Sequence, residues 1–309
     1  MSDSEALIRI EHLYKIFGTR PQKKLSLVKE GIGKQELLEG HQHVLGLSDI
    51  NLEIPKGSLQ VVMGLSGSGK STLIRHINRL IEPTAGEIWV GAEDVMQMDK
   101  VQLREFRRHR TAMVFQRFAL LPHRTVLENV SYGLDIQGIA KDEAHKRAER
   151  WIDRVGLAGY EQHFPAKLSG GMQQRVGLAR ALATDADILL MDEAFSALDP
   201  LIRTDMQNIL LDLQEELHKT IVFITHDLDE ALKLGDQIAI LRDGGMVQQG
   251  TAQQIVMKPA DDYIMDFVRD INRARVLRVR GVMEREGLPE NPDGAIPEHI
   301  SLEDALPRL

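Results

Sequence analysis

The stretch Leu59-Gln-Val-Val-Met-Gly64-Leu-Ser-Gly-Ser-Gly-Lys70-Ser71-Thr72 decides the fold of this chain. Residues 59–63 are mostly apolar, as in a buried strand, a glycine-rich loop follows them, and residues 71–80 have the pattern of a helix. In this context the backbone N–H groups of the loop wrap a nucleotide's phosphates, Lys70 reaches the β- and γ-oxygens, and Ser71 coordinates Mg²⁺. The stretch therefore predicts an α/β domain that binds a nucleotide through Gly64, Ser66, Gly67, Gly69, Lys70, Ser71 and Thr72.

A second glycine-rich turn, Leu168-Ser169-Gly170-Gly171-Met172-Gln173-Gln174, follows about a hundred residues later. It precedes a helical pattern, so it also offers free N–H groups and the positive end of a helix to an anion. One chain cannot easily fold both turns onto one nucleotide, whereas two copies facing head to tail can. We therefore predict a homodimer that forms on ATP binding, in which Ser169, Gly170 and Gly171 of one copy contact the γ-phosphate held by the other.

The composition excludes several classes of protein. The chain has 309 residues, 43% of them hydrophobic and 27% charged, which is ordinary for a globular protein. It has no cysteine, which excludes a disulfide framework and a cysteine-based metal site or nucleophile. The net charge of −8 argues against binding to nucleic acid, and the basic cluster at 104–110 is expected to be a solvated helix face.

The chain also lacks the features of a secreted or membrane-spanning protein. Its first residues have no basic segment followed by an apolar core, as a secretory signal has. Its longest apolar runs are far shorter than the roughly 20 residues of a membrane helix. We therefore expect a cytoplasmic protein, which works at a membrane only by docking onto other subunits.

Strand-like runs at 187–191, 220–225 and 237–242 alternate with helical stretches, which favours a mainly parallel sheet with helical crossovers. Helical patterns at 141–155 and 170–182 indicate a helical subdomain, bounded here as 118–182, between the phosphate-loop strand and the strand before Asp192. Residues 19–44 form an additional polar and partly helical insertion. We predict one nucleotide-binding domain over residues 1–269 and a C-terminal extension over 270–309, in which 273–280 is basic and strand-like.

Two adjacent carboxylates follow the apolar run at 188–191 and are candidates for the chemistry. Asp192 is suited to hold Mg²⁺ through water, although a lone aspartate at a strand end is more often a turn former or helix cap. Glu193 is the candidate general base, positioned to orient a water for in-line attack on the γ-phosphate. The alternative is a solvated acidic pair.

Taken together, these motifs resemble those of the ATP-binding subunit of an ABC transporter. The resemblance implies a P-loop fold of the ABC ATPase type, with a mainly parallel core, an antiparallel β subdomain and an inserted helical subdomain, and ATP and Mg²⁺ as cofactors. By the same resemblance, Gln116 in Met113-Val-Phe-Gln contacts Mg²⁺ and the attacking water, and His226 binds the γ-phosphate. The loop Ser196-Ala-Leu-Asp199 would cross the dimer interface, with the ordinary helix cap as the alternative.

Two aromatic features keep alternatives open. Phe17, in Tyr14-Lys-Ile-Phe17-Gly18, is expected to stack on adenine. The alternatives are that Phe17 is a core aromatic residue, or that Tyr14 stacks on adenine in its place. The apolar stretch Phe118-Ala-Leu-Leu-Pro-His123 is either core or a partner surface. In ABC proteins this region receives the coupling helix of the membrane subunit.

A narrower resemblance is to the ATPase subunits of glycine betaine/proline (quaternary-amine) importers. It rests on the insertion at 19–44 and on four segments: Leu13-Tyr-Lys-Ile-Phe-Gly18, Met63-Gly-Leu-Ser-Gly-Ser-Gly-Lys-Ser71, Asn78-Arg-Leu-Ile-Glu-Pro83, and Met191-Asp-Glu-Ala-Phe-Ser-Ala-Leu-Asp-Pro-Leu-Ile-Arg203. The resemblance implies ATP hydrolysis that powers import through a separate integral-membrane permease, with an external solute-binding protein as an indirect partner. The chain would lie peripherally on the cytoplasmic face of the inner membrane.

Some questions stay open at this point. The solute could be glycine betaine, choline, carnitine, proline betaine, trimethylamine N-oxide or proline, and an ATPase for another solute, an exporter or a non-transport ABC ATPase are the alternatives. Longer members of the group continue into two CBS modules that sense ionic strength. Residues 270–309 leave room for a stub, with 301–306 as a possible first helix. We therefore expect transport not to be gated by CBS modules of this chain.

Overall fold

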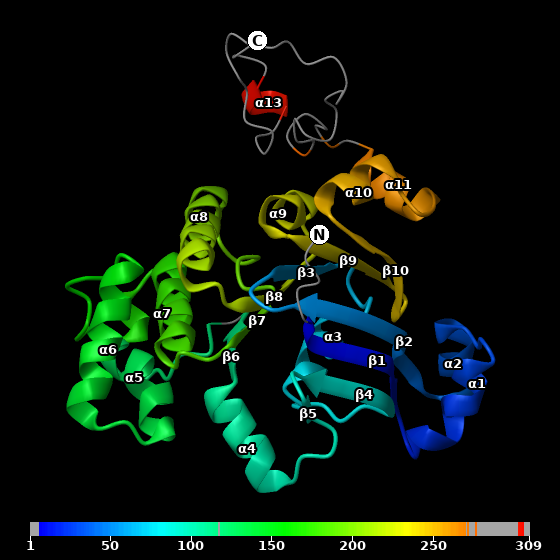
Figure 1. Ribbon diagram of the computed structural model, residues 1–309, viewed down its shortest axis with the longest axis horizontal. Helices are drawn as coiled ribbons and strands as arrows, with labels where there is room; N and C mark the ends of the chain where they lie inside the picture. The colour runs from blue at the N-terminus through cyan, green and yellow to red at the C-terminus, as the bar shows by residue number, and fades with distance from the viewer. Residues whose placement is uncertain (1–5, 117, 270, 272–275, 277–301, 306–309) are drawn as a thin grey trace, which may run out of the picture.

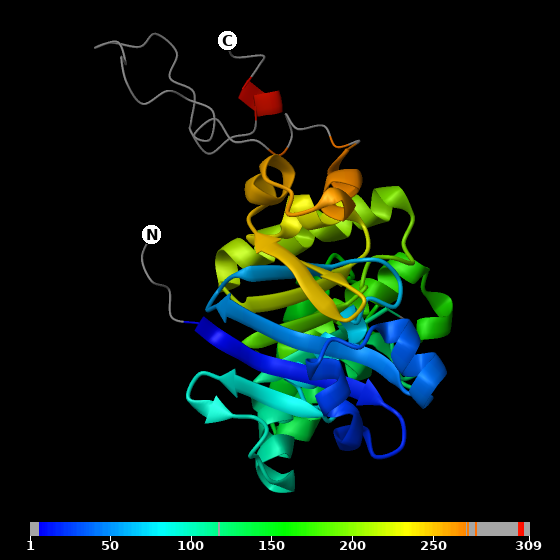
Figure 2. The same cartoon turned by 90° about the vertical axis from the view of Figure 1, so that its right-hand side faces the viewer.

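The computed structural model describes residues 6–116, 118–269, 271, 276 and 302–305. Within these ranges the strands form two sheets, drawn in Figures 1 and 2. The strands are β1 (Ala6–Phe17), β2 (Val44–Pro55), β3 (Leu59–Met63), β4 (Ala85–Val90), β5 (Glu93–Asp94), β6 (Thr111–Phe115), β7 (Ile188–Asp192), β8 (Thr220–Thr225), β9 (Gln237–Arg242) and β10 (Gly245–Gly250).

The helices of the described chain alternate with the strands of the larger sheet. They are η1 (Pro21–Lys24), α1 (Leu25–Lys29), α2 (Lys34–His41), α3 (Lys70–Ile77), α4 (Lys100–His109), α5 (Val126–Gln137), α6 (Lys141–Arg154), η2 (Pro165–Lys167), α7 (Gly170–Ala183), α8 (Pro200–Leu217), α9 (Leu228–Leu234), α10 (Ala252–Met257), α11 (Asp262–Val268) and α13 (Leu302–Ala305).

The larger sheet has the order β10-β9-β3-β8-β7-β6, and only the β9–β10 pair is antiparallel. Every residue of β3, β7 and β8 is buried, as expected for central strands covered on both faces. The parallel register pairs Met63 with Thr225 and Asp192 with Ile224. The ends of these strands therefore lie side by side, where open parallel sheets place their ligands.

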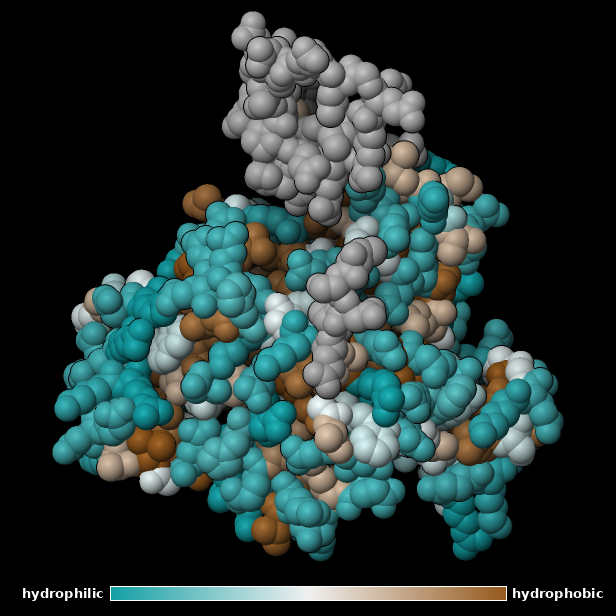
Figure 3. Space-filling view, viewed as in Figure 1, coloured by the Kyte–Doolittle hydropathy of each residue, from teal (hydrophilic) through white to brown (hydrophobic). Residues whose placement is uncertain are grey.

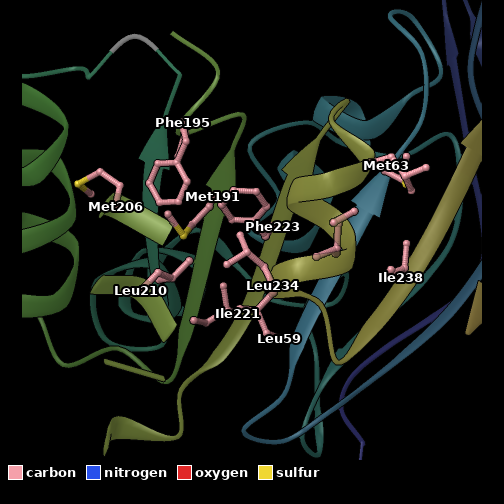
Figure 4. Packing of buried hydrophobic residues seen from close by; sticks show 14 of the residues in the cluster. Leu59, Met63, Met191, Phe195, Met206, Leu210, Ile221, Phe223, Leu234 and Ile238 are labelled. Atoms are coloured by element: carbon pink, nitrogen blue, oxygen red, sulfur yellow. The ribbon is translucent and has the colours of Figure 1, made fainter. Parts of the chain in front are cut away.

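The two faces of this sheet are covered differently. Helices α8 to α11 cover one face, and Figure 4 shows Phe195, Met191 and Phe223 packed toward one another beneath them. The other face packs against α3 and the smaller antiparallel sheet, whose order is β2-β1-β4-β5. The prediction of a mainly parallel core with an antiparallel β subdomain is therefore confirmed.

Helices α5, α6 and α7 form a separate helical part, on the left of Figure 1, with its own hydrophobic core. Capping boxes fix where α4 and α5 begin, because the side chains of Asp99 and Thr125 accept from backbone N–H groups at the start of each helix. The exact limits of this part, 118–182, stay a prediction.

The insertion predicted at 19–44 contains η1, α1 and α2, which lie beside β1 and β2 in Figure 2. Its buried side chains Val28 and Leu37 pack with Tyr14, Ile16 and Leu45. The strand-like segment predicted at 273–280 lies outside the described residues except for Val276. In the expected stub, α13 forms a short helix.

Candidate functional site

The phosphate loop connects β3 to α3. It contains glycines at which a side chain would force the neighbouring backbone to move. At Gly64, with φ of +148°, a Cβ atom would lie 2.2 Å from the carbonyl oxygen of Leu241. At Gly69, with φ of +107°, it would lie 2.6 Å from that of Gly46. Close backbone approach with φ in this range is open to glycine and strained for other residues. The loop is thus shaped as a backbone cradle.

Lys70 lies inside this loop and is 4% exposed. Its Nζ donates to the carbonyl oxygens of Gly64 (2.8 Å) and Leu65 (3.1 Å). Burial lowers the pKa of Lys70, and the nearby carboxylates of Glu193 and Asp192 oppose that shift. An ammonium bound only to carbonyl oxygens and facing carboxylates is suited to exchange these partners for phosphate oxygens.

Asp192, at the end of β7, joins the phosphate loop to the neighbouring strand. Its Oδ1 accepts a hydrogen bond from Ser71 Oγ at 2.7 Å, and its Oδ2 accepts one from Arg75 Nη2 at 3.0 Å. A hydroxyl and a carboxylate in contact are the oxygen donors that Mg²⁺ prefers. The residues present therefore fit a magnesium ion bound together with phosphates, between Ser71 and Asp192.

Glu193 is the point where the predicted catalytic residues meet. Its carboxylate accepts from Gln116 Nε2 at 3.2 Å and lies 3.5 Å from His226 Nδ1 and 3.9 Å from Lys70 Nζ. Gln116 and His226 directly follow β6 and β8, and Lys70 begins α3 after the loop that follows β3, so the parallel register brings the three to Glu193. Glu193 has φ of +48°, a left-handed conformation that costs a residue with a side chain on the order of 1 kcal/mol. The Glu193 side chain lines a cleft beside the phosphate loop.

A cleft of about 300 Å³ joins these groups to the aromatic residue predicted to hold the base. Phe17 lies in its wall and is 38% exposed. Tyr14 is 8% exposed and packs in the core beneath the insertion, outside the lining of this cleft. The cleft is lined by Phe17, Lys34, Val44, Leu45, Gly46, Ser66, Gly67, Gly69, Lys70, Ser71, Thr72 and Glu193.

The second glycine-rich turn does not join this cleft in the described chain. Ser169 is exposed and caps α7, and Asp199 is exposed and caps α8 through its bond from the N–H of Ile202. A Cβ atom on Gly171 would lie 2.6 Å from Cγ2 of Ile202, so this turn packs against the start of α8. Ser169, Gly170, Gly171 and Asp199 are absent from the described lining of the nucleotide cleft. Ser169, Gly170 and Asp199 are exposed and Gly171 is half-buried, so these residues form a second surface outside the cleft.

A larger cleft of about 700 Å³ lies between α4, α5 and α7. Its wall includes Arg104, Arg107 and Arg108 of the basic cluster, so the helix face that was expected to be solvated is exposed at Arg104 and half-buried at Arg107 and Arg108. Arg107 donates to the carbonyl oxygens of Asn78 (2.9 Å) and Arg79 (2.5 Å), and Arg180 donates to that of Ala119 (2.7 Å). The two arginines thus donate hydrogen bonds to carbonyl oxygens that lie outside the helices and strands and would otherwise lack a backbone donor.

The apolar stretch after Gln116 borders this larger cleft. Phe118 and Ala119 both have positive φ, +25° and +49°, and Phe118 packs partly against the central core. Ala119 lines the cleft together with Tyr132, Ile136 and Arg180. The stretch therefore contributes to the core with Phe118 and to the cleft with Ala119.

Two basic residues beside the phosphate loop were not predicted from the sequence. Lys34 reaches it from the insertion, and Arg75 reaches it from the second turn of α3. No local motif marks either residue, because both act through tertiary packing between distant segments. The basic residue four positions after Ser71 was a weak signal for Arg75, since it lies on the same helix face.

None of the described helices is long and apolar enough to cross a bilayer. In the same part of the chain, no group of three or more His, Asp or Glu side chains has the arrangement of a protein-only metal site.

Comparison with known proteins gives consistent results. The ABC transporter family profile matches residues 47–196. The chain is 52% identical over 278 residues to the glycine betaine transport ATP-binding protein OpuAA of Bacillus subtilis, covering 90% of this chain and 66% of that protein. It is 50% identical over 302 residues to the glycine betaine/carnitine transport ATP-binding protein GbuA of Listeria monocytogenes, covering 98% of this chain and 73% of that protein.

A solved structure shares the fold. It is the dimer of the ATP-binding cassette MJ0796 in a post-hydrolysis state bound to ADP and Pi, with a TM-score of 0.68 and 32% sequence identity. The match covers 79% of this chain and 98% of that one. The prediction of an ABC ATPase fold is confirmed by this likeness, and by the two sheets and the helical part described above.

Proposed function

This chain belongs to the ABC transporter family of ATP-binding proteins, and we propose that it is the ATP-hydrolysing subunit that powers import of a quaternary amine such as glycine betaine. The observation that carries the proposal is the meeting of Gln116, His226 and Lys70 at Glu193, beside Asp192 and the phosphate loop. The substrate class rests on the names of OpuAA and GbuA, which are about half identical to this chain.

Hydrolysis of ATP would use the carboxylate of Glu193 as the general base. In this mechanism Glu193 and Gln116 orient a water for in-line attack on the γ-phosphorus, and Glu193 accepts the proton that the water loses. As the bond from water oxygen to phosphorus forms, the bond to the bridging oxygen of ADP breaks. Lys70 and His226 stabilise the γ-phosphate oxygens by hydrogen bonds. Magnesium, when bound by Ser71 and Asp192, would neutralise charge on the β- and γ-phosphates.

The remaining predicted residues would act at the two ends of the nucleotide. Phe17, at the wall of the cleft, would stack on adenine, and its exposure supports this role over that of the buried Tyr14. Ser169, Gly170 and Gly171 would contact the γ-phosphate of a second copy, and Asp199 would lie at the same interface. Their exposure on a separate surface supports the homodimer, since a site assembled by two chains requires an accessible turn.

The larger cleft would receive a helix of an integral-membrane permease. Its size and its position between α4, α5 and α7, next to the stretch that begins after Gln116, support this role. Movement of the helical part on ATP binding would then be transmitted to the permease through residues such as Ala119. We place the chain peripherally on the cytoplasmic face of the membrane, with a solute-binding protein on the far side as an indirect partner.

Uptake of labelled solutes by cells that lack this chain tests the proposal. The strains would carry wild type, Lys70→Ala or the control Lys56→Ala, whose exposed side chain lies outside the cleft. We expect uptake of one betaine-like solute with wild type and Lys56→Ala and none with Lys70→Ala. Unchanged uptake in all strains over a panel of betaines, choline, carnitine and proline would reject the substrate class and favour another transporter.

A further inference from the structure

The insertion at 19–44 is anchored firmly enough to position a side chain at the nucleotide cleft. Leu37 of α2 is fully buried, and the His43 ring lies 2.9 Å from the carbonyl oxygen of Thr19 and 2.6 Å from that of His41. The ring thereby ties together the two ends of the insertion. The start of α2 is consequently fixed relative to β1 and β2, the strands that carry the adenine side of the cleft.

Lys34 is the first residue of α2 and extends into that cleft. Its Nζ donates to the carbonyl oxygen of Gly67, in the middle of the phosphate loop, at 2.7 Å. The helix itself does not explain a lysine here, because a cation at a helix N-terminus is unfavourable by a few tenths of a kcal/mol. The contact of the Lys34 ammonium with the phosphate loop explains why a lysine lies at this position.

The charges along the cleft support a role in binding an anion. Among the described residues, three charged side chains line it: Lys34, Lys70 and Glu193. The ammonium of Lys70 is buried in its own loop, whereas that of Lys34 lies at the open side, on a single carbonyl oxygen. A flexible lysine can exchange a neutral carbonyl partner for a phosphate oxygen, and a hydrogen bond between charged groups is roughly twice as strong.

We propose that Lys34 is an ATP-binding residue supplied by the insertion, and that its ammonium leaves Gly67 to bind an oxygen of the β- or γ-phosphate. The inference rests on the proposed function, since it assigns a further residue to the same nucleotide site. Lys34 then adds a second cation beside Lys70 at the phosphate loop, in the cleft that Phe17 also lines. The consequence is selectivity for di- and triphosphates over monophosphates.

Nucleotide affinity of the full chain tests this inference. A fluorescent ATP analogue is displaced by ATP, ADP or AMP from wild type, Lys34→Gln, Lys34→Arg and Lys23→Gln. Lys23→Gln is the matched control, because this exposed lysine belongs to the same insertion and does not line the cleft. We expect Lys34→Gln to weaken ATP and ADP about 3- to 10-fold and AMP less than about 2-fold, Lys34→Arg to keep most of the affinity, and Lys23→Gln to match wild type.

Three results would overturn the inference: wild-type affinity of Lys34→Gln for ATP and ADP, an equal loss in Lys23→Gln, or an equal loss for AMP. An equal loss in Lys23→Gln would mean that the positive charge of the insertion as a whole, and not a contact of Lys34, attracts the nucleotide. An equal loss for AMP would mean that the substitution has collapsed the cleft. Lys70→Ala, measured alongside, separates this inference from the proposed function. If Lys70→Ala also bound ATP normally, the nucleotide site itself would be misassigned; if only Lys34→Gln bound normally, the site would stand without Lys34.

Discussion

His76 is expected to make the stability of this protein fall between neutral and mildly acidic pH. It lies in α3, directly after the phosphate loop, and its side chain has no exposed surface. Its Nδ1 donates to the carbonyl oxygen of Thr72 at 2.6 Å, while Nε2 is buried without a hydrogen-bond partner. Burial lowers the pKa of His76 from 6.5 to about 4, although the contact with Thr72 opposes the shift.

The direction follows from comparing the folded and unfolded chains. Above pH 6.5 His76 is neutral in both states, so it does not affect stability. Below pH 6.5 the unfolded chain gains a proton that the folded chain does not gain until about pH 4. The shift of 2.5 units, at about 1.36 kcal/mol per unit, gives a loss of roughly 3 kcal/mol across that window, and about 2 kcal/mol of it has occurred by pH 5.

Urea unfolding at pH 7.5, 6, 5 and 4.5 measures the effect. Carboxylates also titrate over part of this range, so the informative quantity is the difference between wild type and His76→Gln. The variant should lose about 2 kcal/mol less than wild type between pH 7.5 and 5, and the control His123→Gln, at an exposed position, should follow wild type. Parallel curves for wild type and His76→Gln would refute the reasoning.

Three further outcomes are expected. Lys70→Ala should bind ATP weakly and show no measurable hydrolysis in a phosphate-release assay, because it removes the ammonium held inside the loop by Gly64 and Leu65; hydrolysis near the wild-type rate would contradict this. Phe195→Ala should lower the free energy of unfolding by about 3–5 kcal/mol, because the Phe195 ring is fully buried, with its centroid 5.4 Å from that of Phe223. The control Leu201→Ala, at a residue that is 79% exposed, should change the free energy of unfolding by less than about 0.5 kcal/mol. Equal effects of the two variants in urea titrations would argue against this packing. Gly69→Ala should fold with lowered nucleotide affinity, because its Cβ would meet the backbone of Gly46; calorimetric titration showing full affinity would exclude that clash.

Much of the fold could be predicted because local pattern and tertiary packing agree in its centre. The strands expected at 220–225 and 237–242 are β8 and β9 with unchanged limits. They are short, apolar and bounded by polar turns, which leaves few alternatives. The helix expected at 71–80 ends earlier, at Ile77, because Arg79 adopts a left-handed conformation that α-helix cannot continue.

The site could be predicted in part. Glu193 and Asp192 were identified because carboxylates at the end of an apolar strand are conspicuous, and the parallel register brings Gln116 and His226 to them. Lys34 could not be found, because its place depends on how the insertion packs on Tyr14 and Leu45. The arginines of α4 were assigned to solvent, since charge alone does not reveal that Arg107 binds turn carbonyls.

If a second copy completes the ATP site, the molar mass of Glu193→Gln in solution should depend on the nucleotide. With ATP and Mg²⁺ this variant should bind without hydrolysing, and light scattering should report twice the monomer mass of 34.8 kDa, whereas ADP should leave it monomeric. In that background Ser169→Asn should still dimerise, because asparagine also caps a helix, while Ser169→Asp should not, because its carboxylate would face the γ-phosphate. A variant that stays monomeric at saturating ATP, or a dimer that Ser169→Asp leaves intact, would contradict the account.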